Sequence, residues 1–427
     1  MELFEYDHHL GERINSYKCN FFHIYLEGES PINNNGSFNK VPLRDYASFI
    51  HEYVHYIQQI TTPYGLKYSI FFNNKYLLYR GYIDSLNFIE LPLKLNEVIE
   101  PANKMEEELG HKNGSKFYNK GSIGDIEINP QDIELAKRED KAVNISVYDF
   151  ENERIISDDF QFGYWCVVES MAHMVQSLVN PNLFHAKIPY KSAQLICDKI
   201  RPDLKGDVKL LISVCYVSLY FNNPGYAFFE VLNSIPRGGE NGVELFRRYM
   251  RDYSRTFKGQ EMPNYRMMHI MMDDFAHKLG ALVGNQLMYY KDVFGSCKRE
   301  SSKGDSFFLN MLYLGDISKI DDLCKVLYYY GYPAIDSCSD DIVVPHNFTT
   351  KKLYLETASL ISLELLINRF EEKEGNKTCL RFPICNRNRE NDKIDEFCEV
   401  QQWLKEKACL FTGGLSYWKW KNKQFNS

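Results

Sequence analysis

The sequence predicts an α+β fold that is predominantly α-helical. Apolar residues recur at intervals of three and four along most of the chain, which is typical of amphipathic helices. One short run of aromatic and β-branched residues lies near the N-terminus and indicates a small sheet. The chain has 427 residues, of which 44% are apolar, so it can bury a large core of two or three packed units.

The expected strand covers residues 20–26, which read Asn-Phe-Phe-His-Ile-Tyr-Leu. Its rough alternation of side chains favours β-structure, and the loop-forming residues between Gly28 and Asn39 end it. If this strand lies at an exposed edge of the sheet, its main chain could hold an extended peptide by hydrogen bonding.

The next predicted element is a helix from Leu43 to Ile60. Its apolar residues keep helical spacing, and residues 61–65, Thr-Thr-Pro-Tyr-Gly, are a typical helix stop. His51 and His55 are four positions apart, so a helix places both imidazoles on one face, where they can bind a single metal ion.

Glu52 stands between these histidines, so the segment offers a possible catalytic residue as well as possible metal ligands. Zn²⁺ lowers the pKa of a bound water and polarises a carbonyl, and a neighbouring glutamate can act as the general base. The segment therefore predicts zinc-dependent hydrolysis. A simpler interpretation is that both histidines only satisfy hydrogen bonds on a helix face or in the core.

A catalytic zinc needs a third protein ligand, and residues 56–66 contain no histidine, which excludes the metzincin extension. Glu169 is the best candidate, because it lies in an apolar helical stretch where an unpaired carboxylate would be costly. His173, one turn later, could join the metal site directly or hydrogen-bond a ligand, and we favour the hydrogen bond. Glu169 could instead be an ordinary ion-paired side chain. The competing third ligands are Asp273, Asp274, His277 and Glu356.

The segment His51 to His55 followed by Glu169 resembles the gluzincin pattern of HExxH zinc metallopeptidases, in which a glutamate on a second helix completes the site. The resemblance covers two helices. It implies a zincin-like catalytic core, in which a small N-terminal sheet accompanies the active-site helix, and zinc as the cofactor. The family's second helix often reads Glu-x-x-x-Asp, whereas this chain has His173 in the last place and separates His55 from Glu169 by 114 positions.

A hydrolase of this kind also needs a donor to the developing oxyanion, usually a Tyr or His from outside the motif helix. Tyr226 is one candidate, because it follows the turn Asn-Asn-Pro-Gly of residues 222–225 between two apolar helices and could project into a cleft. Structural packing is the alternative role.

Further helical patterns occur at residues 160–179, 207–221, 227–234, 267–290 and 352–370. Residues 101–144 are polar, contain four glycines and lack apolar periodicity, which indicates a mobile insertion or lid. We therefore predict four parts: residues 1–100 with the strands and the HExxH helix, 101–144 as the polar insertion or lid, 145–300 as the helical half that carries the third ligand, and 301–427 as a C-terminal helical subdomain.

Charge and cysteine content restrict the partners and the location that we expect. The formal net charge is −7, so nucleic acid is not an expected partner. The longest apolar stretch, around residues 210–221, is too short for a membrane span, and residues 1–13 lack the apolar region of a signal peptide. Eleven irregularly spaced cysteines favour free thiols in a reducing compartment, and we expect a cytoplasmic protein. Four C-terminal cysteines could hold a structural metal but lack the tight zinc-knuckle spacing: Cys379, Cys385, Cys398 and Cys409.

These patterns predict a zinc metallopeptidase that hydrolyses peptide bonds of an intracellular protein substrate. An unregulated protease would damage the cytosol, so we expect a narrow substrate or a gated site, with a regulatory partner that controls activity. The motif alone leaves open a bond other than a peptide bond. The alternative is a non-catalytic helical binding or scaffold protein that keeps a zincin-like core.

Overall fold

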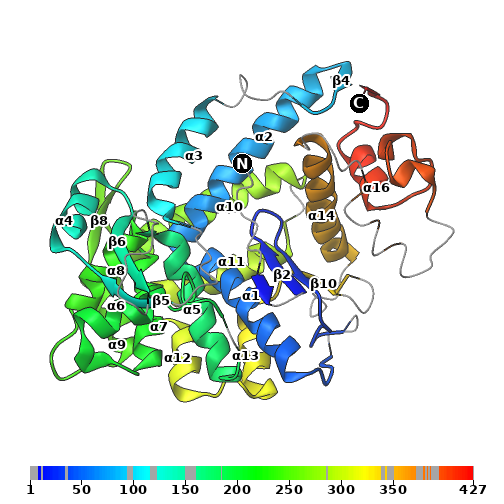
Figure 1. The fold of residues 1–427 in the computed structure, drawn as a ribbon. Helices are drawn as coiled ribbons and strands as arrows, with labels where there is room; N and C mark the ends of the chain where they lie inside the picture. The colour runs from blue at the N-terminus through cyan, green and yellow to red at the C-terminus, as the bar shows by residue number, and fades with distance from the viewer. Residues whose placement is uncertain are drawn as a thin grey trace.

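The computed structural model describes residues 8–10, 13–33, 37–93, 100–115, 123–149, 160–183, 185–284, 287–337, 342–343, 351–371, 378–379, 382, 385 and 394–426. Helices predominate and the strands form small sheets, which confirms the predicted α+β, mainly helical class. In Figure 1 the helices around α6 to α9 lie on the left and α14 and α16 on the right, with α1 and the N-terminal strands between them.

The N-terminal sheet has four strands in the order β1-β2-β3-β10. Neighbours pair antiparallel except β3 and β10, which run parallel with His23 opposite Ala334 and Leu26 opposite Ser337. Because β3 has a partner on each side, the expectation that it is an edge strand free to hold a peptide is wrong. The strands are β1 (His8–Leu10), β2 (Arg13–Lys18), β3 (His23–Leu26) and β10 (Ala334–Ser337).

Helix α1 (Leu43–Thr61) confirms the predicted motif helix, and α2 (Pro63–Ser85) follows it after a single residue. Thr62 caps α2 by accepting a hydrogen bond from the backbone N–H of Gly65, and Pro63 suits the first turn because that position needs no N–H donor. A Cβ at Gly65 would lie 2.5 Å from the carbonyl oxygen of Gln58, so only glycine allows this tight reversal.

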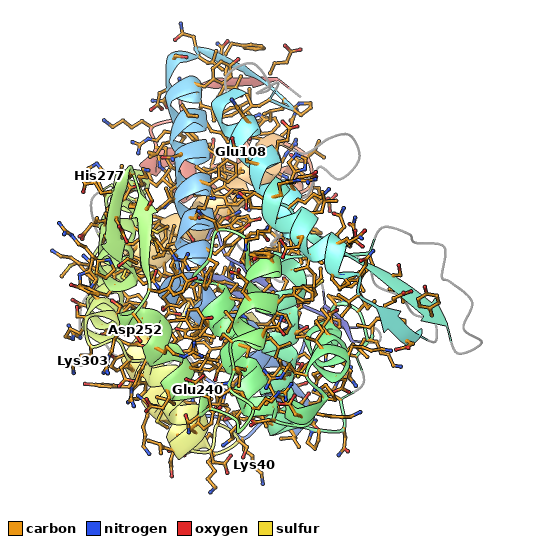
Figure 2. All side chains as sticks on the ribbon, turned by 90° about the vertical axis from the view of Figure 1, so that its left-hand side faces the viewer. Lys40, Glu108, Glu240, Asp252, His277 and Lys303 are labelled. Carbon is orange, nitrogen blue, oxygen red and sulfur yellow. The ribbon has the colours of Figure 1, made fainter. Side chains whose placement is uncertain are left out.

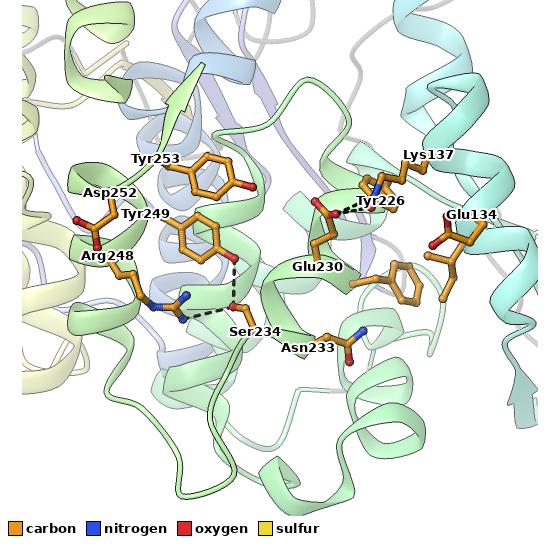
Figure 3. A pocket seen from close by; sticks show the side chains of 12 residues that line it. Glu134, Lys137, Tyr226, Glu230, Asn233, Ser234, Arg248, Tyr249, Asp252 and Tyr253 are labelled. Atoms are coloured by element: carbon orange, nitrogen blue, oxygen red, sulfur yellow. Dashed lines mark hydrogen bonds and ion pairs between the residues drawn. The ribbon is translucent and has the colours of Figure 1, made fainter. Parts of the chain in front are cut away.

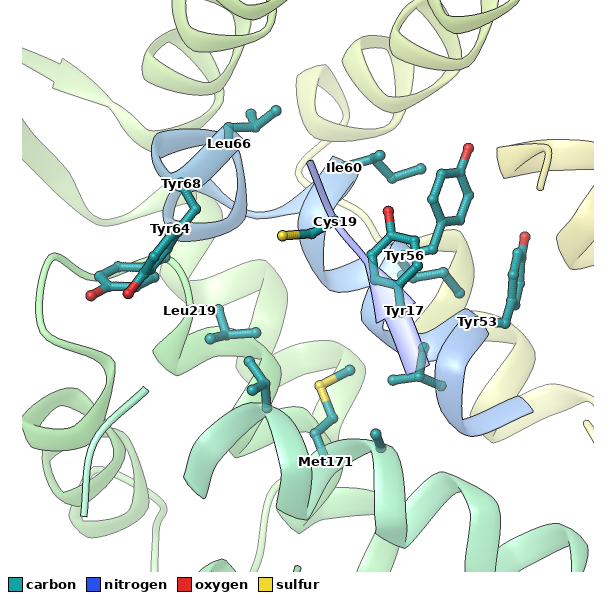
Figure 4. Close-up of a cluster of buried hydrophobic side chains, with 14 of the residues drawn as sticks. Tyr17, Cys19, Tyr53, Tyr56, Ile60, Tyr64, Leu66, Tyr68, Met171 and Leu219 are labelled. Atoms are coloured by element: carbon teal, nitrogen blue, oxygen red, sulfur yellow. The ribbon is translucent and has the colours of Figure 1, made fainter. Parts of the chain in front are cut away.

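The core around α1 is rich in tyrosine. Figure 4 shows tyrosines of β2 and α1 on one side of this cluster and Met171 of α5 (Tyr164–Val179) on the other. The hydroxyls of Tyr53 and Tyr56 donate to the carbonyl oxygens of Gly331 and Tyr330, at 2.6 and 2.8 Å. These bonds satisfy the buried hydroxyls and tie α1 to the end of α13 (Ile320–Tyr330).

Residues 101–144 contain more regular structure than the sequence predicts. They hold most of α3 (Glu100–Asn113), β5 (Ile123–Glu127), α4 (Pro130–Glu139) and the start of β6 (Val143–Asp149). Strands β5, β6 and β7 (Phe160–Phe162) form a three-stranded sheet that leads directly into α5. The segment thus has regular structure, and its interpretation as a mobile insertion or lid stays a prediction.

The remaining helices build the rest of the core. The predicted helix at 267–290 is two helices, because Gly284 takes a left-handed conformation (φ 71°) just after the first one ends. The helices are α6 (Ser192–Ile200), η1 (Pro202–Leu204), α7 (Val208–Ser218), α8 (Pro224–Asn233), α9 (Gly242–Arg251), α10 (Asn264–Leu282), α11 (Tyr289–Ser302), α12 (Phe307–Leu314), α14 (Lys351–Glu371), η2 (Glu396–Cys398), η3 (Gln402–Leu404) and α16 (Leu410–Tyr417).

Two further strand pairs complete the fold. Strands β8 (Ser254–Phe257) and β9 (Gln260–Pro263) form an antiparallel hairpin before α10. Strand β11 (Gln424–Asn426) pairs parallel with β4 (Phe88–Glu90), so the C-terminal residues return to the end of α2. Within the described ranges, no helix combines the length and the apolar character needed to cross a membrane.

Candidate metal centre

Helices α1 and α5 pack against each other and bring the three predicted ligands together. An oxygen of Glu169, Oε2, lies 3.4 Å from Nε2 of His51 and 3.7 Å from Nε2 of His55. The ligand atoms of these three residues all lie within 4.8 Å of one another. Tetrahedral zinc holds its ligands at about 2.0–2.1 Å, which places neighbouring ligand atoms about 3.3 Å apart. The group therefore fits one ion.

All three ligands and Glu52 are buried. Their exposed fractions are 2% for His51, 1% for Glu52, 2% for His55 and 3% for Glu169. Burial lowers the pKa of His51, although hydrogen bonding to Glu169 opposes this shift. A neutral imidazole is the form that binds a metal ion.

Two glutamines fix the orientation of the histidine rings. Nδ1 of His51 lies 3.0 Å from Oε1 of Gln176, and Nδ1 of His55 lies 2.8 Å from Oε1 of Gln58. The amide nitrogen of Gln58 donates to the carbonyl oxygen of Val168 at 3.0 Å, which sets the direction of this amide. Both rings therefore donate from Nδ1, and both Nε2 atoms face Glu169, as metal-ligating histidines require.

Glu52 is buried beside His51 on α1 but is not a member of the three-ligand group. Its carboxylate is therefore not one of the three candidate metal ligands.

The hydrogen bond to a ligand that the sequence predicts for His173 is made instead by Gln58 and Gln176. His173 lies one turn after Glu169, and its Nε2 is 3.5 Å from the hydroxyl of Ser177. Gln176 lies two turns after Glu169 on the same face of α5, and its longer side chain spans the distance to His51.

Two residues that sequence reasoning missed lie against the centre. The ring centroids of His185 and Tyr190 are 6.2 and 6.1 Å from that of His51. Both belong to the connection between α5 and α6. This connection has no helical or strand periodicity that would have indicated where its side chains lie.

This connection is fastened to α5 by Ser170. The hydroxyl of Ser170 donates to the carbonyl oxygen of Pro189 at 2.9 Å and accepts from the backbone N–H of Ala193 at 3.2 Å. The side chain of Lys187 also donates to the carbonyl oxygen of Ile123 in β5. The connection is therefore held over the centre at several points.

His173 and His185 are both neutral at physiological pH. The pKa of His173 is lowered to about 2, mainly by burial and to a smaller extent by the neighbouring imidazole of His185. Burial, followed by the imidazole of His51, lowers the pKa of His185 to about 3. Their ring nitrogens are thus available as hydrogen-bonding or metal-binding groups across the physiological range.

The competing third ligands have other partners. Asp273 pairs with Lys298, and Asp274 pairs with Lys278 at 2.9 Å. His277 is exposed on α10 and lies at the outer edge of the molecule in Figure 2. Glu356 accepts hydrogen bonds from three backbone N–H groups at the start of α11. Within the part of the chain that is described, only Glu169 joins the two motif histidines.

The structure does not bring Tyr226 to the metal centre. Asn223 caps α8 through the backbone N–H of Tyr226, and the Tyr226 hydroxyl donates to Glu230 one turn later. Figure 3 shows Tyr226, Glu230 and Lys137 in a surface hollow of about 720 Å³. No residue of the metal centre lines this hollow. The predicted oxyanion role of Tyr226 is therefore not supported, because the local helix geometry directs the side chain elsewhere.

All ten cysteines in the described ranges are free thiols. Cys398 accepts a hydrogen bond from Lys405 at 2.7 Å, and Cys409 helps to cap α16. Among the described residues, no cysteine takes part in a possible metal group.

Comparison with known proteins identifies no family. No family model, no curated protein and no solved structure matches this chain. The interpretation of the site therefore rests on its geometry and chemistry.

Proposed function

We propose that this protein is a zinc-dependent metallopeptidase with a zincin-like core, in which His51, His55 and Glu169 bind the ion and Glu52 is the general base. The observation that carries the proposal is that Oε2 of Glu169 lies 3.4 Å from Nε2 of His51 and 3.7 Å from Nε2 of His55. The glutamines behind the rings support it, because they hold the imidazoles in the tautomer that a metal needs.

A bound Zn²⁺ would lower the pKa of the attacking water and polarise the scissile carbonyl. Glu52 would accept a proton from the attacking water and donate it to the leaving nitrogen. Gln58 and Gln176 keep the ligand rings in place during this cycle. The low exposure of the site excludes bulk water, which strengthens each of these electrostatic interactions.

The same burial supports a gated enzyme with a narrow protein substrate. A peptide cannot reach ligands that are 2–3% exposed unless a covering segment moves. The connection between α5 and α6 is the segment that we expect to move, because His185 and Tyr190 on it lie against His51. A regulatory partner or the substrate itself would then displace this connection and expose the metal centre.

The second candidate function is a non-catalytic binding or scaffold protein that keeps a zincin-like core. The observation that favours it is the enclosure of the site, because a metal that never meets a substrate can still stabilise the fold.

Metal content is the first test. We expect about one tightly held zinc per chain after dialysis of the wild type, and its loss in His51→Ala, His55→Ala and Glu169→Ala, because each removes a ligand. His277→Ala is the matched control, since this histidine is exposed on α10. Zinc that persists in all three ligand variants would show that the motif is incidental.

Glu52→Gln separates the two candidate functions. We expect this variant to keep zinc and fold while it loses peptide hydrolysis, because an amide cannot accept the proton of the water. The measurement is the set of new N-termini that appear in a cell lysate after incubation with each protein. Termini that appear with the wild type and not with Glu52→Gln support the peptidase. The same termini with both proteins, or none with either, favour the non-catalytic function.

A further inference from the structure

A second pair of histidines beside the centre repeats the geometry of the first. The rings of His51 and His55 have centroids 4.9 Å apart and planes at 74°. The rings of His173 and His185 have centroids 4.5 Å apart and planes at 64°. Two imidazoles that bind one ion through adjacent corners of a tetrahedron have centroids about 5 Å apart. The second pair thus has the spacing of a metal-binding pair.

The nitrogens of the second pair lack the contacts that buried polar atoms normally make. Nδ1 of His173 and Nε2 of His185 have no hydrogen-bond partner within the described ranges. The two residues are only 3% and 8% exposed. A buried polar group without a partner destabilises the fold, so an occupant that binds these nitrogens would remove that penalty.

Charges of both signs act on the pair. Glu169 lies one turn before His173 on α5, and both Glu169 and the ammonium of Lys191 interact electrostatically with the two rings. The ring of Tyr190 lies 4.8 Å from that of His185, centroid to centroid. Imidazole nitrogen is a preferred ligand of zinc and of related divalent transition metals.

We propose that His173 and His185 bind a second divalent transition-metal ion, zinc or one of its class, next to the three-ligand centre. This ion binds more weakly than the first, because it has two histidine ligands and no carboxylate ligand, and because the ammonium of Lys191 acts on both rings. The inference uses the first centre as a neighbour and does not depend on which bond that centre hydrolyses.

The experiment is a zinc titration of the metal-free full-length protein by calorimetry, with elemental analysis after desalting. We expect the wild type to bind about two zinc ions, one tight and one weak. His173→Phe and His185→Phe should keep the tight ion and lose the weak one, since phenylalanine keeps the ring packing without a ligand atom. His277→Phe is the control and should bind both ions.

Each outcome decides a separate point. A wild type that saturates at about one zinc, or a weak zinc that survives in both His173→Phe and His185→Phe, overturns the second site. A zinc ion that survives in His51→Ala but is lost in both His173→Phe and His185→Phe overturns the first centre and supports the second site. If the phenylalanine variants do not fold, Co²⁺ absorption of the wild type decides: two steps support the second site and a single step overturns it.

Discussion

Gln58 offers a test of how much the surroundings of a ligand contribute to metal binding. This side chain is 3% exposed, accepts a hydrogen bond from Nδ1 of His55 and donates to the carbonyl oxygen of Val168. Gln58→Met keeps the volume and removes both bonds. The ring of His55 then loses the acceptor that keeps its proton on Nδ1 and its Nε2 directed toward Glu169.

The expected loss can be worked from these contacts. Removing a partner behind a metal-ligating histidine typically lowers metal affinity by about 10- to 100-fold, which is about 1.4–2.7 kcal/mol. Two lost hydrogen bonds also lower the free energy of unfolding by roughly 1–3 kcal/mol. The two effects are measured separately, by competition for zinc with a chromophoric chelator and by chemical denaturation of the metal-free protein.

The adjacent Gln59 is the matched control. It is 5% exposed, and its amide nitrogen donates to the carbonyl oxygen of Cys19 and to the hydroxyl of Ser69, both at 2.7 Å. Its Oε1 also accepts a hydrogen bond from the hydroxyl of Tyr17, so Gln59→Met should destabilise the protein at least as much as Gln58→Met and leave zinc affinity unchanged. Zinc affinity of Gln58→Met within about twofold of the wild type, or an equal loss in Gln59→Met, would refute the reasoning.

Three further predictions concern groups outside the centre. Burial raises the pKa of Glu300 from 4.5 to about 8, so the wild type should lose up to about 1.4 kcal/mol of unfolding free energy per pH unit between these values. Glu300→Gln should lack this slope in urea denaturation series, and equal slopes would contradict the assignment. Glu356→Ala should lower the free energy of unfolding by about 1–3 kcal/mol, because it leaves three backbone N–H groups at the start of α11 without their acceptor; an unchanged melting temperature would contradict this. Tyr226→Phe should leave zinc content and hydrolysis unchanged, because its hydroxyl meets Glu230; lost hydrolysis would return this residue to the site.

The motif helix and the candidate third ligand could be predicted because local sequence patterns indicate both. Helical spacing fixes His51 and His55 on one face of α1 whatever surrounds them. The cost of a buried carboxylate indicated Glu169 from its apolar flanks alone, and the structure places it against both histidines.

Other features depend on contacts between distant segments, which a single sequence does not encode locally. His185 and Tyr190 reach the centre because Ser170 holds their connection against α5, and no periodicity marks that contact. The pairing of β3 with β10 joins segments about 300 positions apart. The helix α3 was missed because its polar surface conceals the pattern, and regular structure there follows from packing against α2 and α5.

The parallel pairing of β3 with β10 has a consequence for the synthesis of the chain. Ala334 is made 311 positions after His23, its partner in the sheet. At a translation rate of about 5–20 residues per second, β3 waits roughly 15–60 seconds for its neighbour. Both helices of the metal centre emerge during this interval, so the centre can assemble while one edge of the sheet is still open. An open edge is a template for pairing with another chain, so β3 is exposed to such pairing until the last third of the protein is made.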